Sequence, residues 1–395
     1  MVLLLLPGFG PWPLLAQIDP VKRDLLQFGY NAPLEGHPPL AAYGFYYRNQ
    51  PDFIQTNLTL RLALAPVYLD SELGISQALG PHTDLGIGVA GGGFADSYRE
   101  IDRGTYLPSQ SFDGYSGEGS LSVYHLFNPG GRIPLTGLMR GIVHYSAFDR
   151  DDDTAPNFRL PENFSTFALR TGLRWGGREP MLFPDLAMEL SIWYEGYLRT
   201  FAGDYGYGDR RVEPHSHLFW GEALLAYTLP ECKHSFFLGL TAGTSIDADR
   251  FSAYRLGGQL PLAAEFPLAL PGYYFQELSA QRFVLVNANY ILPLDKHQRW
   301  NLDFTAASAA VDYLPGLGQH GAWNSGVGGG LLYRTSSLKI MAGYAYGVDA
   351  VRSSGRGANS IGILMQLDLE KANFLLPADP GVWRGLQDMF NLFGR

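Results

Sequence analysis

The chain has 395 residues, a formal net charge of −9 and only 17% charged residues. A nucleic-acid-binding protein needs basic patches and a disordered chain needs a high charge density, so this composition argues against both classes. Aromatic residues make up 14% of the chain and there are 48 glycines, a combination that favours many strands and turns over a helical core.

Residues 1–16 have the features of a secretory signal peptide. The run MVLLLLPGFGPWPLLA is apolar and ends in a small residue at the expected cleavage point. It lacks a positively charged start, so an ordinary apolar tail remains the alternative. Pro7, Pro11 and Pro13 interrupt the run, which argues against a transmembrane helix, because that needs about 20 apolar residues.

Along most of the chain, apolar and polar residues alternate with a period of two. In residues 186–194, one set is apolar and the other contains Glu189 and Ser191. Several such runs, including 133–149, 185–201 and 300–313, are longer than the roughly 5 to 6 residues of globular strands. They are also long enough for the about 9 to 11 residues that cross a bilayer. The pattern therefore predicts membrane-spanning strands with one lipid-facing side.

Runs of this kind predict about sixteen strands, an even number as closed bacterial barrels require. They lie at residues 26–32, 40–49, 54–69, 72–79, 83–95, 118–128, 133–149, 163–178, 184–201, 215–230, 235–247, 282–294, 299–314, 322–335, 338–352 and 359–370. Short turns at 129–131 and 230–233 alternate with long polar links at 96–117, 150–162, 202–214 and 248–281. This is the arrangement of short periplasmic turns and long outer loops. We predict an all-β domain over residues 17–370, a closed antiparallel transmembrane β-barrel.

Tyrosine and tryptophan gather near the ends of the predicted strands, as in the aromatic girdles at membrane interfaces. Ordinary aromatic strand residues are the alternative. The residues concerned are Tyr194, Tyr197, Trp220, Trp323, Tyr344 and Tyr346.

The last predicted strand contains SIGILMQL, from Ser360 to Leu367. Its spacing of Gly362, Met365 and Leu367 resembles the signal by which outer-membrane barrels are recognised for insertion, although strand alternation alone explains part of it. The resemblance implies that the cell's barrel-assembly machinery inserts this chain.

A tail at residues 371–395 follows the last strand. Trp383, Leu386, Phe390 and Phe393 share one face at helical spacing, which predicts a short amphipathic helix at the membrane surface or barrel mouth. Disorder is the alternative, because Gly385 disfavours a helix.

Four motifs follow one another from Tyr254 onward. They are Arg255-Leu256-Gly257-Gly258, Pro271-Gly272-Tyr273, Asn289-Tyr290-Ile291-Leu292-Pro293-Leu294 and Phe304-Thr305-Ala306-Ala307. In this order they resemble the BamA/TamA superfamily of outer-membrane assembly and translocation proteins, also called bacterial surface antigens. In that family, a long loop carries Leu-Gly-Gly and an Arg-Gly-Phe/Tyr tip that folds back into the barrel. The following strands end in Glu-Tyr-Arg-x-Pro-Leu and carry Phe-x-Asp-x-Gly. Five predicted strands follow the loop, as in the sixteen-strand members.

The departures from this pattern remove charges. Pro271 replaces the tip arginine, Asn289 and Ile291 replace the strand-end pair, and Thr305 replaces the wall aspartate that meets the tip. Asp303 lies two residues earlier on the same predicted inward face. Losing both members of a buried ion pair costs far less than losing one. We therefore expect an inward-folded loop at 248–281 that is held by packing of its aromatic tip, with proline stiffening the turn.

The family usually carries soluble POTRA modules before the barrel. Only about ten residues separate Ala16 from the first predicted strand, so the resemblance implies a branch without these modules.

The alternation places a mixed-charge set inside the predicted barrel. Such a lining suits a pore or a substrate path, but a polar interior is also ordinary for barrels of this kind. The predicted lumen-facing residues are Arg140, His144, Arg170, Arg174, Glu189, Glu195, Glu222, Asp303 and Thr305.

We predict no metal site, no cofactor and no enzymatic activity. The acidic run 149–153 lacks the glycine and closing glutamate of a calcium loop, so an acidic outer loop is the preferred interpretation. His215 and His217 share a strand face without a third ligand nearby in sequence. The sequence contains no Gly-x-Ser-x-Gly elbow and no convincing Ser/His/Asp set.

The resemblance implies a barrel in the outer membrane of a Gram-negative-type bacterium that aids insertion or translocation of polypeptide or lipid. Its expected partners are membrane lipid and that cargo. The alternative is a passive channel of the porin kind, or the barrel component of a larger envelope complex.

Overall fold

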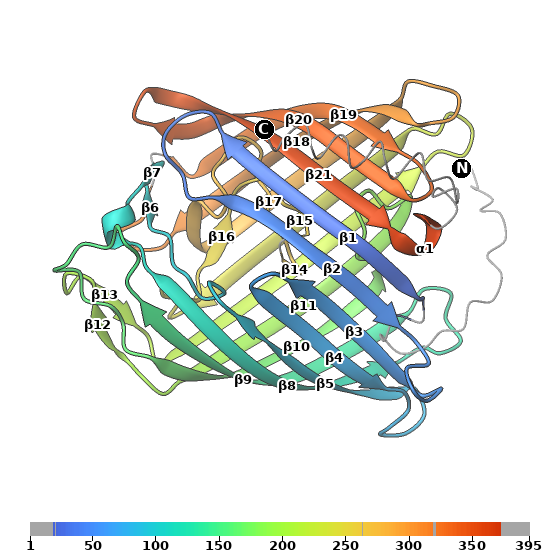
Figure 1. Cartoon of the computed structure of the whole chain (residues 1–395), viewed down its shortest axis with the longest axis horizontal. Coiled ribbons are helices and arrows are strands. Elements are labelled where there is room, and N and C mark those ends of the chain that lie inside the picture. Colours follow the sequence, from blue (N-terminus) through green and yellow to red (C-terminus); the bar gives the residue numbers. More distant parts are fainter. Residues whose placement is uncertain (1–18, 20, 263, 319–320, 373–395) are drawn as a thin grey trace, which may run out of the picture.

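The computed structural model describes residues 19, 21–262, 264–318 and 321–372. These residues form a closed antiparallel β-barrel (Figure 1). Its main sheet has 17 strands, of which sixteen make the wall and one, β16, is a short addition. The wall strands are β1 (Arg23–Pro33), β2 (Ala41–Gln50), β3 (Leu58–Ala65), β4 (Tyr68–Ile75), β5 (Thr83–Gly92), β8 (Asp113–Leu126), β9 (Leu135–Asp149), β10 (Phe164–Gly177), β11 (Leu186–Arg199), β14 (His215–Thr228), β15 (Ser235–Ile246), β17 (Leu278–Pro293), β18 (Trp300–Tyr313), β19 (Trp323–Arg334), β20 (Leu338–Arg352) and β21 (Gly355–Asp368).

The remaining elements are short and lie mostly in the long links. They are β6 (Ile101–Asp102), β7 (Thr105–Tyr106), a 3₁₀ turn (Pro108–Gln110), β12 (Gly203–Tyr205), β13 (Arg210–Val212), β16 (Tyr254–Leu256) and the helix α1 (Leu369–Ala372). No helix in the described part of the chain is long and apolar enough to cross a membrane.

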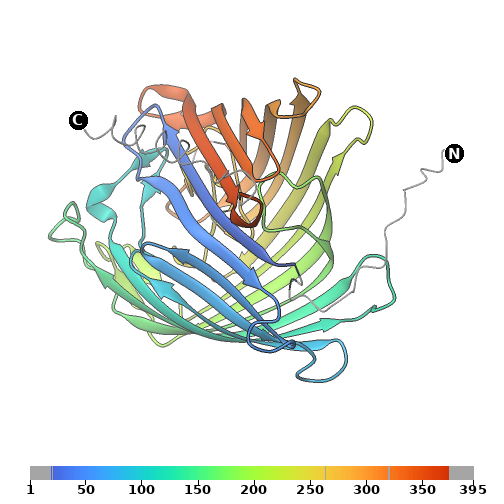
Figure 2. The same cartoon turned by 45° about the vertical axis from the view of Figure 1, so that its right-hand side comes forward.

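The barrel closes between its first and last strands. Residues Leu25 to Pro33 of β1 pair antiparallel with Asp368 to Ser360 of β21. The two strands lie side by side in both views, blue beside red (Figures 1 and 2). Closure satisfies backbone hydrogen bonds that lipid cannot satisfy, so the predicted all-β barrel class is confirmed.

The period-two pattern places large apolar side chains on the outside of the barrel. Leu190, Ile192 and Leu238 are 53%, 62% and 57% exposed, whereas their neighbours Glu189 and Ser191 are buried on the inner side. In water this outer surface would be strongly unfavourable, but lipid tails solvate it. The outward face is therefore the lipid-facing face.

Several predicted strand boundaries are wrong. The second hairpin on the long-link side turns at 66–67, between β3 and β4, and not near 70–71. Apolar alternation continues across this two-residue turn, so the periodicity does not reveal it. Two strands start earlier than predicted: β8 begins at Asp113 and not at 118, and β17 begins at Leu278 and not at 282, where its first residues pair with β16.

The aromatic girdle is present only in part. Tyr344, Tyr346 and Trp323 are exposed on the outside, whereas Tyr197 and Trp220 point inward and pack against buried clusters. For these two residues the girdle prediction is wrong, because odd positions of β11 and even positions of β14 face the lumen.

The β3–β4 hairpin is short, so part of the neighbouring strand β2 pairs with a strand on one side only. Each of the two strands has 8 residues. Among the described strands, residues 41–45 of β2 pair with β1 only, because pairing with β3 begins at Tyr46. This part of β2 therefore presents an edge.

Residues 1–16 and 373–395 lie outside the described residues. The predicted signal peptide and nearly all of the predicted tail are therefore not described.

Candidate functional site

The connection between β15 and β17, residues 247–277, is here named the internal loop. It is fixed at its start, where Arg199 of β11 donates to Asp249 at 2.8 Å and both side chains are 3% exposed. Further on, β16 pairs with the beginning of β17. Leu256, Leu270 and Tyr273 are fully buried within the largest hydrophobic cluster. The loop thus packs as part of the core, in agreement with the predicted inward fold.

The tip of the internal loop lies against the wall strands β19 and β20. Gly272 has a φ of +80°, and a Cβ placed on it would lie 1.9 Å from the backbone nitrogen of Gly347. A Cβ on Gly326 would lie 2.0 Å from the carbonyl oxygen of Pro271. Backbone meets backbone at this contact, and only glycine permits that approach.

A buried ion pair joins the loop to the wall. Arg352 at the end of β20 donates to both carboxylate oxygens of Glu277, at 2.8 and 3.0 Å, and the two side chains are 1% and 0% exposed. The guanidinium also stacks on the Tyr274 ring, 3.7 Å from its centroid. Tyr274 in turn donates to the carbonyl of Glu35 in the first outer link. The expectation of a loop held by packing without a charged latch is therefore wrong.

The predicted motif residues come together at the base of the loop. Arg255 donates to the carbonyls of Gln276 and Arg99, both at 3.1 Å. Gly257 and Gly258 have φ values of +135° and +73° and approach the backbone of residues 274–277 closely. Their role is to let the two arms of the loop pack tightly.

Asp303 and Thr305 face inward as predicted but do not meet the tip. The tip contacts Gly326, which pairs with Ala307, whereas Asp303 pairs with Gly330 four residues further along β19. Asp303 instead accepts a hydrogen bond from Asn289 at 2.6 Å. The tip therefore lies nearer the long-link end than this resemblance implied.

The loop also contacts the opposite wall. Glu265 accepts hydrogen bonds from Arg170 and Arg174 of β10, at 3.1 and 3.4 Å. The next residue, Phe266, packs on Trp193 and Trp220, with ring centroids 5.2 and 5.5 Å apart. The internal loop therefore crosses the lumen from β10–β14 to β19–β20.

The other predicted lumen residues are paired rather than lining an open path. Each charged group lies beside a partner of opposite charge from another strand or from a link. The pairs are Arg140 with Glu72, Arg170 with Glu195, Arg174 with Glu189, Arg178 with Glu222, and His144 with Asp96 and Glu118.

A second segment enters the barrel from the other end, and the sequence reading missed it. The short link 178–185, here named the inner turn, buries Leu182 in one cluster with Leu260 of the internal loop. The backbone of Leu182 donates to Gln366 at 2.9 Å and accepts from Lys339 at 2.5 Å. The signal for it is the apolar run Met-Leu-Phe between two prolines, which is unusual for a water-exposed turn.

The other residues that the sequence analysis singled out lie on β21, in the acidic run and on β14. Gly362 faces inward while Met365 and Leu367 lie on the outer side of β21, opposite Phe28 and Leu26. Their role as an insertion signal stays a prediction. In the acidic run, Asp151 pairs with Arg99 at 3.1 Å. His217 hydrogen-bonds Tyr194 at 2.9 Å.

Replacing Gly272 with alanine is expected to lower the free energy of unfolding by about 1–3 kcal/mol, because the residue must keep a positive φ and meets the Gly347 backbone. Urea unfolding of the refolded barrel measures this. Gly117→Ala is the matched control, since nothing lies within 4 Å of its added Cβ. We expect that change to stay within about 0.5 kcal/mol, and equal effects of both variants would contradict the tip contact.

Acidification is expected to loosen the Glu265 contact. Burial alone would raise the pKa of the Glu265 carboxyl, but Arg170, Arg174 and Arg140 hold this pKa below its ordinary value. A lowered folded pKa gives stability that is complete above the unfolded pKa and is lost as the pH falls through the folded pKa. A spin label at position 264 should therefore gain mobility as the pH falls below the ordinary pKa range of a glutamate. The label in Glu265→Gln should show no such transition, and an unchanged transition there would refute the assignment.

No family model matches the sequence, and no curated protein matches it. Among solved structures, the chain is similar to CdiB from Acinetobacter baumannii, with a TM-score of 0.58 and 12% identity over 88% of this chain and 60% of that chain. It is similar to CdiB from Escherichia coli, with a TM-score of 0.54 and 10% identity over 91% of this chain and 64% of that chain. It is also similar to BamA from Haemophilus ducreyi lacking POTRA domains 1–3, with a TM-score of 0.53 and 11% identity over 87% of this chain and 70% of that chain. The chain thus spans less than two thirds of the two CdiB chains and has the barrel fold that CdiB and BamA share.

Proposed function

We propose that this protein is an outer-membrane barrel of the BamA/TamA superfamily that aids insertion or passage of a polypeptide or lipid in a Gram-negative-type bacterium. The observation that carries the proposal is the internal loop, which crosses the lumen and is fixed to opposite walls by Glu265 and Glu277. The similarity to CdiB and BamA supports the same role. The role involves no covalent chemistry, and the barrel-assembly machinery of the cell inserts the chain.

The edge of β2 supports a polypeptide as the cargo. Residues 41–45 have a β-partner on one side only, so their other side offers backbone donors and acceptors. An incoming strand can pair with such an edge by β-augmentation, which needs no particular cargo sequence. The barrel would hold a cargo strand there while it enters the membrane.

The test is an insertion assay in proteoliposomes. A urea-denatured outer-membrane barrel is added, and its folding is followed by the gel shift of the folded form. We expect folding several-fold faster than in protein-free vesicles. Deletion of the tip, residues 270–274, should remove the acceleration while the variant itself stays folded. Equal folding rates in vesicles with and without this protein would overturn the proposal.

A passive channel is the second candidate. The paired charges of the lumen favour it only weakly, since they show a polar interior without an open path. Steady solute conductance that is insensitive to Pro271→Arg and to deletion of the tip would favour the channel over the assembly role.

A further inference from the structure

The lipid-facing side of the barrel carries a hollow over β14 and β15. Two rows of outward residues cross five adjacent strands there, as the strand registers show. The row nearer the barrel middle is Ile192, Gly221, Ala242, Val284 and Ala310. The row nearer the long-link end is Tyr194, Phe219, Thr244, Arg282 and Asp312.

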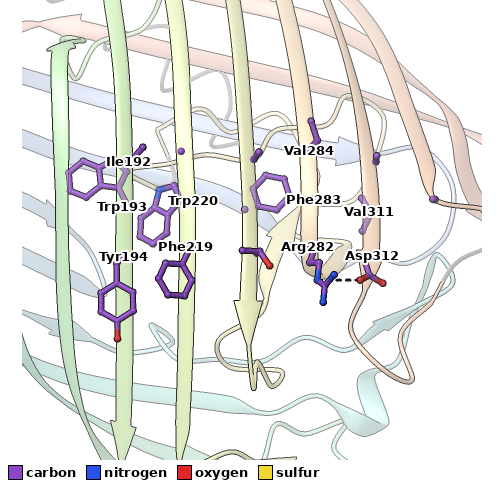
Figure 3. A pocket seen from close by; sticks show the side chains of 16 residues that line it. Ile192, Trp193, Tyr194, Phe219, Trp220, Arg282, Phe283, Val284, Val311 and Asp312 are labelled. Carbon is purple, nitrogen blue, oxygen red and sulfur yellow. Dashed lines mark ion pairs between the residues drawn. The ribbon is translucent and has the colours of Figure 1, made fainter.

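The hollow arises because small residues stand between large ones. Gly221 and Ala242 lie between Ile192 and Val284, and Thr244 lies between Phe219 and Arg282. The resulting cavity has a volume of about 860 Å³ and a mainly apolar lining. Figure 3 shows the residues that line this cavity, with Ile192, Phe219 and Val284 among the labelled apolar side chains. One row beyond Ala242, away from the long-link end, the outward position on β15 is filled by the larger Leu240, which is 46% exposed.

One end of the hollow is polar. Arg282 of β17 and Asp312 of β18 are directly opposite each other, with their closest nitrogen and oxygen 3.8 Å apart (Figure 3). Their side chains are 68% and 63% exposed. An exposed pair at this distance adds little stability, so folding does not explain two charges on a lipid-facing surface. The hollow is therefore amphipathic, with its charges toward the long-link end and its apolar part toward the membrane core.

We propose that this hollow binds one membrane lipid whose headgroup carries a phosphoethanolamine group. An acyl chain lies over Gly221 and Ala242, the phosphate accepts hydrogen bonds from Arg282, and the ammonium group donates to Asp312. The pairing follows from charge complementarity, because the two protein charges have opposite signs and adjacent positions. A purely anionic headgroup would face repulsion from Asp312, and a quaternary ammonium has no N–H to donate.

Native mass spectrometry of the purified full-length protein tests this with phosphatidylethanolamine, phosphatidylcholine and phosphatidylglycerol of equal chain length. We expect one retained phosphatidylethanolamine at concentrations where the other two are not retained. Arg282→Gln should weaken its binding about tenfold. Asp312→Asn should weaken phosphatidylethanolamine and strengthen phosphatidylglycerol, a reversal that general destabilisation does not produce.

The apolar part is tested by filling it. Ala242→Leu should abolish retention, because the added side chain occupies the hollow. Ala342→Leu is the matched control, since Ala342 is an exposed outward alanine on β20, away from the hollow. Arg356→Gln controls for loss of an exposed arginine, because Arg356 of β21 is 71% exposed and pairs with Asp349 of β20, away from the hollow. Equal retention in Ala242→Leu and Ala342→Leu, or unchanged selectivity in Asp312→Asn, would show non-specific lipid only and overturn the proposal.

Discussion

Replacing Arg352 with methionine is expected to destabilise the folded barrel by about 3–5 kcal/mol, because it leaves the carboxylate of Glu277 buried without its guanidinium partner. The same change removes the cation stacked on Tyr274. Releasing the base of the internal loop into water relieves this cost, so we also expect new protease cleavage within residues 247–277. Urea unfolding and limited proteolysis of the refolded protein measure the two effects.

The double variant distinguishes an ion pair from simple packing. Glu277→Met combined with Arg352→Met removes both charges and should recover most of the lost stability, since neither charge then remains buried alone. Arg211→Gln breaks a largely exposed pair with Glu213 and should change stability by less than about 1 kcal/mol. If the double variant is as unstable as Arg352→Met, the loop is held by packing and the latch assignment fails.

The barrel could be predicted because its determinants are local. Lipid outside and polar groups inside impose a period of two on each strand, and residues 186–194 show it without knowledge of their neighbours. Turns are less visible when the alternation continues through them, as at 66–67. The predicted direction of a side chain is wrong where the alternation within its strand places it inside and the girdle prediction placed it outside, as for Tyr197 and Trp220.

The latch could not be predicted because it is non-local and because the acid and the arginine have exchanged sides. Glu277 and Arg352 lie 75 residues apart. The resemblance directed attention to a tip arginine and a β18 aspartate, whereas the acid here lies on the loop and the arginine on β20. From the sequence, an arginine at a strand end is indistinguishable from a solvated outer-loop arginine.

The sequence of the inner turn contains a feature that the period-two pattern does not explain. Leu182 and Phe183 are apolar in a short link, and lipid, a core or a partner all explain apolar residues there. Only the closed barrel brings Lys339 and Gln366 within reach of this link. The lumen is therefore occupied from both ends, and the contact between Leu182 and Leu260 lies where the two segments meet.

Removing both segments is expected to convert the barrel into an open pore. The internal loop is held by Arg352 and β10, while the inner turn is held by Gln366 and Lys339. Each segment therefore has contacts with the wall that do not depend on the other segment. Replacing residues 259–275 with a short Gly-Ser linker should therefore leave the inner turn in place and give only low conductance. Replacing residues 179–184 alone should likewise leave the internal loop in place.

Only the double replacement should give large, steady single-channel conductance in planar bilayers. Replacement of the turn 77–82 between β4 and β5 is a control for altering a link, since none of its residues is buried. If replacing 259–275 alone already gives the full conductance, the inner turn is no independent barrier. If the double replacement stays closed while the barrel is folded, the wall itself narrows the lumen, because paired side chains such as Arg174 and Glu189 already meet across neighbouring strands.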